Sequence, residues 1–331
     1  MTEKEQGIKL IEIIATTAYP IVSAYEYEFL KQEEVVRERM KGATVYFILQ
    51  RPLTFFNNLV PGEGELTFDI WDGVNPPLKC NVDFAAFDVA PGKTVELEIQ
   101  YFREPASKVA PYNEVAAFRI KETDGMFVVW ETPQKLLYEA LANGLEVSIE
   151  GDIGPYLEFH VHYIGQAFSQ KVWNRLTGHE KMQKILTLEA PLSSLTTRSP
   201  FEVSILMLSV VGMNDAAAYF NWEAVVPPGT EPILHEYDLE EDNDSFEKFY
   251  LPQLTLGSAE LTNEVEALLI NLFQPEYNEK LFKNYPNIKR GTRSAGYTAA
   301  SLSIEKLPAV LSTKHHTQAA IVVGSSDWSE Q

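Results

Sequence analysis

Short β-prone runs alternate with turn sequences over a long stretch of the chain, and this pattern most constrains the fold. Between residues 43 and 130 the runs are ATVYFILQ, LTFDIWD, VDFAAFDV, TVELEIQYF, AAFRIK and MFVVWE. They are separated by PGEGE, DGVNPP, APGK and ETDG, whose Gly, Pro, Asn and Asp residues favour tight turns. We therefore predict an antiparallel sandwich or barrel-like domain in this region.

Helical signals flank the β-prone region. Residues 24–41 carry long polar side chains with i to i+4 Glu/Arg pairing, which predicts one helix. Thr132 and Pro133 favour the start of a second helix, and Gly144 is a natural C-cap for it. We place a domain boundary there. The chain then divides into a β-rich recognition or interaction domain over 1–143 and a second domain over 144–331.

The second domain is expected to mix strands and helices. The expected order is strand 145–150, strand 157–164, helix 171–186, strand 201–211, helix 258–273 and strands 298–304 and 318–323. An irregular insertion around 212–256 holds a strongly acidic run. The predicted class is α+β, with an antiparallel β-rich domain followed by a small sheet flanked by helices.

The net charge of the chain limits how it can bind nucleic acid. Its 27 basic and 47 acidic residues give a net charge of −20, which disfavours wide, non-specific coating of nucleic acid. Residues 231–247 hold eight acids and no Lys or Arg, whereas residues 280–293 hold five basic residues and no acid. This asymmetry is compatible with one locally basic groove. The acidic run is either a solvated loop or a phosphate mimic that blocks this groove.

Cysteine content and hydropathy narrow the cellular setting. The single cysteine, Cys80, excludes an intramolecular disulfide and a cysteine-based zinc cluster. No apolar run reaches the ~18 residues of a membrane span, and the N-terminus lacks a signal-peptide pattern. We therefore expect a cytoplasmic protein without a membrane partner.

Three motifs follow one another in the second domain. Tyr163-Ile164-Gly165 ends a β-branched stretch, and Arg175 and His179 are four apart, so they share one helix face. The sequence EVEALLINLFQPEYN then contains Glu266 near the start of a helix and Asn278 after its end. Phosphodiester hydrolysis needs a metal ion at the phosphate, a group that activates water and a cation for the developing charge. These residue types can supply all three.

In this order the motifs resemble the GIY-YIG nuclease family, and the last one looks most like the catalytic domain of the nucleotide-excision-repair nuclease. The resemblance covers about 150–285, with FEVSILMLSV as the middle strand. The family's namesake tyrosine on the first strand aligns best at Gly144-Leu145-Glu146, with glutamate in its place. A second candidate for this motif is Gly154-Pro155-Tyr156.

The resemblance implies a metal-dependent endonuclease that uses Mg²⁺ or Mn²⁺. Glu266 would be the metal ligand, and Arg175 would hold the phosphate with its planar fork. Tyr163 would activate or orient the water, with His179 as its proton-relay partner. Gly165 would let the backbone turn closely past the phosphate. Asn278 would lock local geometry or contact the substrate.

Basic side chains near these motifs are candidates for contacts with a nucleic-acid backbone. They are Lys171, Lys181, Lys184, Lys280, Lys283, Lys289 and Arg290. The expected partner is nucleic acid, DNA rather than RNA, and the β-rich domain is expected to bind a protein partner or a nucleic-acid feature. The alternative function is a catalytically degenerate protein of the same fold that only binds, because the first tyrosine is missing.

Each of these residues also has an ordinary structural explanation. Tyr163 would be a half-buried strand tyrosine, Arg175 a solvated helix residue and Glu266 a first-turn helix acid. His160 and His162 share one strand face, where a zinc site would lack a third ligand at convincing spacing. Polar-face histidines are therefore the preferred explanation for that pair.

Overall fold

The computed structural model describes most of the chain between Leu10 and Gln318. The described residues are 10–167, 172–176, 180–188, 201–214, 259–284, 286–289, 291–295 and 297–318. The α+β class is confirmed in them, because helices accompany two sheets. No helix in this part of the chain is long and apolar enough to span a membrane.

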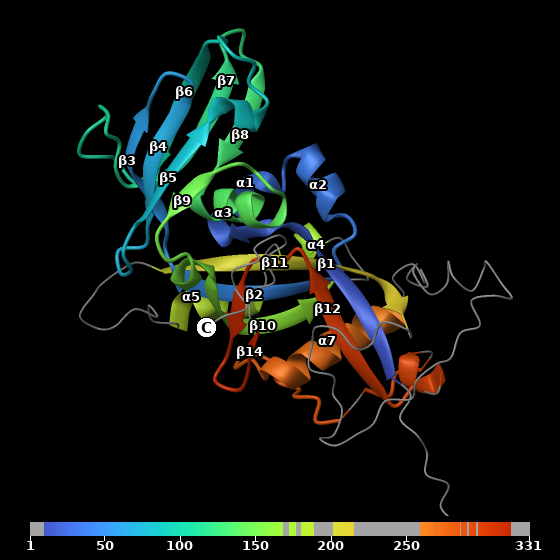
Figure 1. Ribbon diagram of the computed structural model, residues 1–331. Helices are drawn as coiled ribbons and strands as arrows, with labels where there is room; N and C mark the ends of the chain where they lie inside the picture. The colour runs from blue at the N-terminus through green and yellow to red at the C-terminus, as the bar shows by residue number, and fades with distance from the viewer. Residues whose placement is uncertain are drawn as a thin grey trace, which may run out of the picture.

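The first sheet combines strands from both ends of the chain. In the described residues its strands run in the order β12-β1-β11-β2-β10-β13-β14 (Figure 1). They are β1 (Leu10–Ser23), β2 (Val45–Pro52), β10 (Glu158–Gln166), β11 (Phe201–Asn214), β12 (Ala299–Glu305), β13 (Val310–Ser312) and β14 (Thr317–Gln318). β2 pairs antiparallel with both β10 and β11, and its apolar residues are buried on both faces.

Helices cover both faces of this sheet. α7 (Ala259–Phe273) packs on one face, where the ring of Phe273 meets that of Phe47 at 6.1 Å. On the other face a second core collects Tyr46 and Ile48 of β2. This core is closed by α1 (Ala24–Leu30), α2 (Glu34–Met40), α4 (Val172–Leu176) and α5 (Glu180–Leu188). Successive side chains of β2 point to opposite faces of the sheet and therefore belong to two separate cores.

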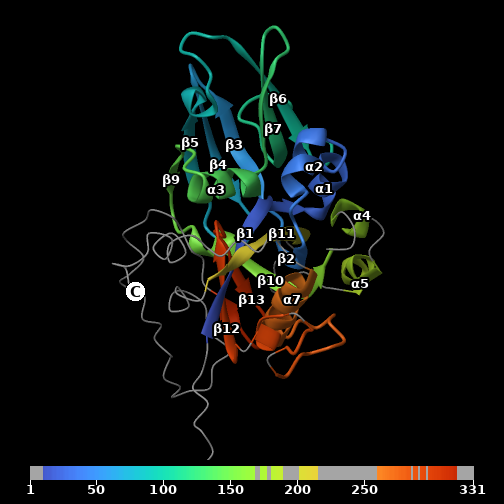
Figure 2. The same ribbon diagram turned by 90° about the vertical axis from the view of Figure 1, so that its right-hand side faces the viewer.

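The second sheet forms the β-rich unit seen above the first sheet in Figures 1 and 2. Its strand order is β6-β7-β3-β4-β5-β9, with β8 also paired to β7. The strands are β3 (Phe55–Pro61), β4 (Glu65–Trp71), β5 (Leu78–Asp83), β6 (Val95–Tyr101), β7 (Val115–Glu122), β8 (Phe127–Glu131) and β9 (Ser148–Glu150). All their pairings are antiparallel, as predicted, and Phe56, Phe68 and Phe118 pack together in the core.

The predicted boundary between residues 143 and 144 does not separate the two sheets. β1 and β2 precede that boundary but belong to the sheet of β10 and β11. The β-rich unit is instead inserted between β2 and β10, and Gln50 and His160 on the flanking strands are direct partners. Local patterns mark both kinds of strand alike, so they do not show which strands pair over a long sequence separation.

Several predicted elements differ in detail. The helix predicted over 24–41 is two helices, because the chain turns after α1 and buries both Tyr27 and Met40 in one core. The helix predicted over 171–186 is described as α4 and α5, and residues 177–179 between them lie outside the described part. The strand expected at 145–150 is confirmed only over β9, and that expected at 318–323 is described only at Gln318, in β14.

Short helices complete the fold. α3 (Pro133–Ala142) begins after Thr132, whose hydroxyl accepts from the Lys135 amide at 3.2 Å, as the Thr-Pro signal predicted. The three 3-10 turns in the described residues are η1 (Phe84–Phe87), η2 (Gly154–Leu157) and η3 (Thr292–Ala295).

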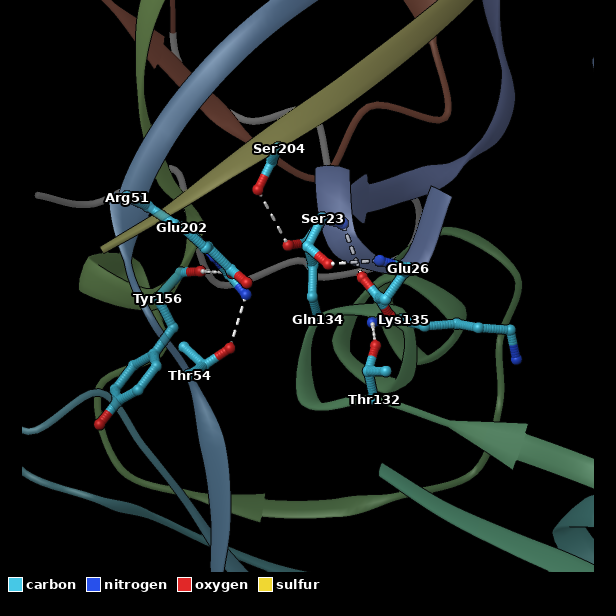
Figure 3. A network of polar contacts seen from close by, with 10 residues as sticks. All are labelled: Ser23, Glu26, Arg51, Thr54, Thr132, Gln134, Lys135, Tyr156, Glu202 and Ser204. Atoms are coloured by element: carbon cyan, nitrogen blue, oxygen red, sulfur yellow. Dashed lines mark hydrogen bonds and ion pairs between the residues drawn. The ribbon is translucent and has the colours of Figure 1, made fainter. Parts of the chain in front are cut away.

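A buried arginine ties the first sheet to the β-rich unit (Figure 3). Arg51 of β2 donates from Nε to Glu202 at 2.6 Å, from Nη2 to the Thr54 hydroxyl at 2.7 Å and from Nη1 to the Tyr156 carbonyl at 3.1 Å. The Arg51 residue is only 2% exposed. A buried guanidinium is tolerated when its donors and its charge are matched in this way.

A buried carboxyl group and a buried side-chain amide lie at the start of α3, at the same junction. Glu131 is ion-paired with Lys135, and the Ser204 hydroxyl donates to Gln134 at 3.4 Å. Burial raises the pKa of Glu131 to about 7, although Lys135 opposes the shift. The Glu131 carboxyl group therefore takes up a proton more readily in the folded protein than in the unfolded chain.

We expect Glu131→Gln to reduce the pH dependence of stability. A group whose folded pKa is raised stabilises the protein fully below its unfolded pKa, near 4.5, and this stabilisation is lost as the pH rises through 7. The free energy of unfolding should fall over this range by up to about 3 kcal/mol from Glu131, and the variant should lose less. Urea unfolding across this pH range measures the difference. The same substitution at exposed Glu28 is the control, and equal pH profiles for wild type and Glu131→Gln contradict the prediction.

Candidate active site

Two tyrosines from neighbouring strands lie side by side in the first sheet. Tyr163 of β10 and Tyr46 of β2 have ring centroids 6.2 Å apart. A register shift between Val161 and Tyr163 marks a bulge in β10, which resets the alternation of side chains. Beyond the bulge Gly165 is the direct partner of Tyr46. Tyr46, Tyr163 and Gly165 therefore share one face of the sheet.

Gly165 is needed for space rather than for a turn. A Cβ atom at this position would lie 2.7 Å from Cε1 of Tyr163 and 2.7 Å from the hydroxyl of Tyr46. The residue lies inside the extended strand β10, and the expected close approach of its backbone to a phosphate stays a prediction. The missing side chain of Gly165 lets the Tyr46 ring cross β10 and reach Tyr163.

Arg175 of α4 joins the two tyrosines. Its guanidinium donates to the Tyr46 hydroxyl, and the hydroxyls of Tyr46 and Tyr163 are hydrogen-bonded to each other. Burial raises the pKa of both tyrosines, and Arg175 opposes the shift. Both phenols are therefore protonated at neutral pH and act as hydrogen-bond donors. The Arg175 side chain is exposed, so an anion from solvent can reach it.

Glu266 of α7 approaches the same group. Gln166 at the end of β10 donates to Asn263 at 3.2 Å, which holds the first turns of α7 beside that strand. Burial raises the pKa of Glu266 to about 7, and the Arg175 charge opposes it. In turn the Glu266 charge raises the pKa of Tyr163. Tyr46, Tyr163, Arg175 and Glu266 come from β2, β10, α4 and α7 and lie close enough for their charges to influence one another; we call them the four-residue site.

The segment after α7 clasps the edge of β10. The Asn278 side chain accepts from the Ile164 amide at 3.0 Å and donates to the Ile164 carbonyl at 2.8 Å. The Tyr277 amide donates to the His162 carbonyl at 3.1 Å. Both the oxygen and the nitrogen of the Asn278 side-chain amide therefore bond to the strand that carries Tyr163. This supports the predicted role in locking local geometry.

The basic segment over 280–293 is anchored on α7. Buried Glu264 accepts from the Thr292 amide at 2.9 Å and from its hydroxyl, and the Asn271 side chain donates to the Phe282 carbonyl. These two anchors lie on either side of Glu266 in the helix. They hold the segment that carries exposed Lys283 and Lys289 against the helix that carries Glu266.

The predicted basic contacts differ in their surroundings. Lys181 is ion-paired with Glu279 at 2.7 Å and lies near enough to Tyr163 to lower its pKa. Lys184 lies over the Tyr277 ring, 5.7 Å from its centroid. Lys280, Lys283 and Lys289 are exposed. Lys171, His179 and Arg290, and the acidic run over 231–247, lie outside the described residues.

The sequence motifs did not single out Tyr46 and indicated Glu146 and Tyr156 as candidates instead. Tyr156 packs in the core of the β-rich unit and donates to the Pro76 carbonyl at 2.8 Å. Glu146 is exposed just before β9, which pairs with β5. Neither residue is on a strand beside Tyr163, whereas Tyr46 of β2 is. The available signal was the tyrosine in ATVYFILQ, which had been assigned to the β-rich domain.

No cluster of three or more His, Cys, Asp or Glu side chains suited to a metal ion occurs among the described residues. The rings of His160 and His162 are 4.8 Å apart, and His162 is hydrogen-bonded to Gln50 at 2.9 Å. Comparisons with family models, with curated proteins and with solved structures find no match. A function for this chain is therefore inferred from the four-residue site itself.

We expect Gly165→Ala to lower the free energy of unfolding by about 1–3 kcal/mol, because the new methyl group overlaps both tyrosines. In a chain that already carries Tyr46→Ala, the same Gly165→Ala substitution should cost less, because the ring it would overlap is gone. Chemical denaturation of the two single variants and the double variant measures the coupling. Additive losses would show that Gly165 and Tyr46 do not compete for the same space.

We expect Asn278→Ala to destabilise the protein by about 1–3 kcal/mol, because the Ile164 amide and carbonyl lose their partners. Hydrogen exchange at the Ile164 amide should speed up relative to that at Phe47, its partner across the β2–β10 pair. Protection at Ile164 unchanged from wild type would show that Asn278 does not hold this strand edge.

Proposed function

We propose that this protein is a metal-dependent endonuclease of the GIY-YIG type that hydrolyses nucleic-acid phosphodiester bonds. The observation that carries the proposal is the meeting of Tyr46, Tyr163, Arg175 and Glu266 from four separate elements. The family pattern expects a tyrosine on the strand beside Tyr163, and Tyr46 occupies such a strand. The reason for a degenerate, binding-only protein was the absence of that tyrosine, so we favour the enzyme.

The side chains of the site have two proposed roles: binding the phosphate and positioning the reacting groups. The exposed guanidinium of Arg175 can grip two phosphate oxygens and offset the charge that develops during hydrolysis. Half-buried Tyr163, as a protonated donor, would orient the attacking water or a phosphate oxygen, and fully buried Tyr46 would hold Tyr163 and Arg175 in place. This differs from a role as proton acceptor, because burial raises the pKa of both phenols.

Glu266 is suited to hold a divalent ion. Its carboxylate is a hard oxygen ligand, and its raised pKa shows that Arg175 alone does not compensate for its burial. A cation at Glu266 would remove that imbalance. We therefore assign Mg²⁺ or Mn²⁺ to Glu266, with water and substrate oxygens as the other ligands. When bound, the ion would neutralise phosphate charge.

The proposed substrate is DNA rather than RNA, and the anchored basic segment supplies backbone contacts. Lys283 and Lys289 are exposed in the segment anchored on α7, and Lys181 is close to Tyr163. Because the whole chain carries a charge of −20, binding confined to this region favours a regulated or partner-directed enzyme over a general one.

The test is cleavage of plasmid DNA, single-stranded DNA and RNA with Mg²⁺ or Mn²⁺. We expect Arg175→Ala and Glu266→Ala each to lower the cleavage rate by about 100-fold or more, because each removes a contact to the reacting groups. Tyr46→Phe should also lower the rate, because it removes the buried hydroxyl that positions Arg175 and Tyr163. Glu260→Ala in the first turn of α7 and Arg103→Ala in the β-rich unit are matched controls and should keep wild-type activity.

The outcomes separate the alternatives. Binding of nucleic acid without cleavage by wild type would indicate the degenerate binding protein. Cleavage that survives in both Arg175→Ala and Glu266→Ala would point to a contaminating nuclease and remove the support for this site. Neither binding nor cleavage would leave the β-rich unit as the functional part of the chain.

A further inference from the structure

A small cavity lies between α1 and the β-rich unit and shares no residue with the four-residue site. Its volume is about 40 Å³. About 10–15 Å³ of such space is enough for one water molecule, so the cavity has room for a small chemical group. Tyr25 and Phe102, which line it, are 59% and 44% exposed, so it opens to solvent. Trp130 and Tyr101 also line it.

Not every carboxyl group near this cavity has a cationic partner among the described residues. Three carboxyl groups and two cations meet at the junction shown in part in Figure 3. Arg51 is paired with Glu202 and Lys135 with Glu131, which leaves Glu26 without an ion-pair partner in the described part of the chain. The described residues that line the cavity include Glu26 and Glu202 but neither Lys nor Arg. The cavity therefore favours a cation.

One carboxylate oxygen of Glu26 has no partner at hydrogen-bonding distance among the described residues, although the nearby Thr132 hydroxyl helps to lower the pKa of the carboxyl group. Glu26 is 6% exposed, and its Oε2 accepts from the Ser23 amide at 2.6 Å in the capping box of α1. Its Oε1 is buried and has no hydrogen-bond partner among the described residues. An unpaired carboxylate oxygen in the interior is costly, and a ligand with N–H donors in the cavity would satisfy it.

Gln134 offers a second polar group. It lines the cavity, is 5% exposed, and its Nε2 also has no hydrogen-bond partner in the described part. Its Oε1 accepts from the Ser204 hydroxyl at 3.4 Å. Because a hydroxyl can both donate and accept, turning the Gln134 amide over keeps this contact and directs its oxygen to the cavity.

Aromatic rings surround the opening. The Tyr25 ring lies 5.0 Å from Phe29 and 6.3 Å from Phe102, and Phe29 is 57% exposed. The faces of such rings attract ammonium groups. A contiguous set of exposed aromatic side chains is typical of protein interfaces, which points to a macromolecular source for the cation.

We propose that this cavity binds the side-chain ammonium group of a lysine from a partner protein. The Glu26 carboxylate accepts hydrogen bonds from the ammonium group, and the residues next to that lysine pack on Tyr25, Phe29 and Phe102. The compact ammonium group suits the small volume better than the larger planar guanidinium of arginine. The interaction depends on none of the proposed catalytic residues, so it stands or falls separately from nuclease activity.

The test uses the full chain and the peptide acetyl-Ala-Leu-Lys-Leu-Ala-amide, with norleucine in place of lysine as the control peptide. We expect calorimetry to show at least about tenfold tighter binding of the lysine peptide, a difference typical of one satisfied buried charge. Glu26→Gln should abolish this preference. Its amide oxygen can still accept from Ser23, so the capping box is kept, and circular dichroism verifies the fold. Glu28→Gln on the same helix should leave the preference unchanged.

A second variant identifies the source of the ammonium group. Phe29 does not line the cavity, so Phe29→Ser should weaken the peptide several-fold and leave binding of methylammonium unchanged. Equal affinities for the lysine and norleucine peptides, or a preference that survives in Glu26→Gln, would overturn the proposal. Methylammonium that binds as tightly as the peptide would overturn the assignment to a partner protein.

Discussion

The pairing of β2 with β10 determines the geometry of the candidate site. The bulge before Tyr163 brings that side chain to the face of Tyr46, and the absence of a side chain at Gly165 lets the two rings meet. A slip of one residue would turn Tyr163 towards the core under α7 and remove it from Arg175. The clasp of Asn278 on Ile164 holds the free edge of the same strand, so this register is fixed from both sides.

Local patterns in the sequence predicted most of the elements but not their partners. Turn residues marked the short strands of the β-rich unit, and Thr132-Pro133 marked the start of α3, because these signals act within a few residues. The spacing of Tyr163, Arg175 and Glu266 singled out three members of the site. Tyr46 was missed because its place beside Tyr163 results from strand pairing across the whole β-rich insertion, which periodicity does not encode.

Other differences arise from packing. Gly165 was singled out for its backbone freedom, whereas its surroundings show that two tyrosine rings require the space. Glu266 was predicted as a metal ligand from its motif, but the sequence does not indicate the burial that raises its pKa to about 7. The pairing of Arg51 with Glu202 depends on contacts between distant strands. Such properties follow from the assembled core rather than from any short stretch of sequence.

The insertion of the β-rich unit between β2 and β10 has a consequence for how the protein is made. During synthesis β2 leaves the ribosome long before β10, so the two tyrosines cannot meet until the entire insertion has been produced. Closing such a loop costs entropy that grows only slowly with its length. An insertion that folds first shortens the effective loop further, because its ends leave the first sheet beside each other, at Gln50 and His160. Assembly of the site is therefore a late event that depends on the earlier folding of the inserted unit.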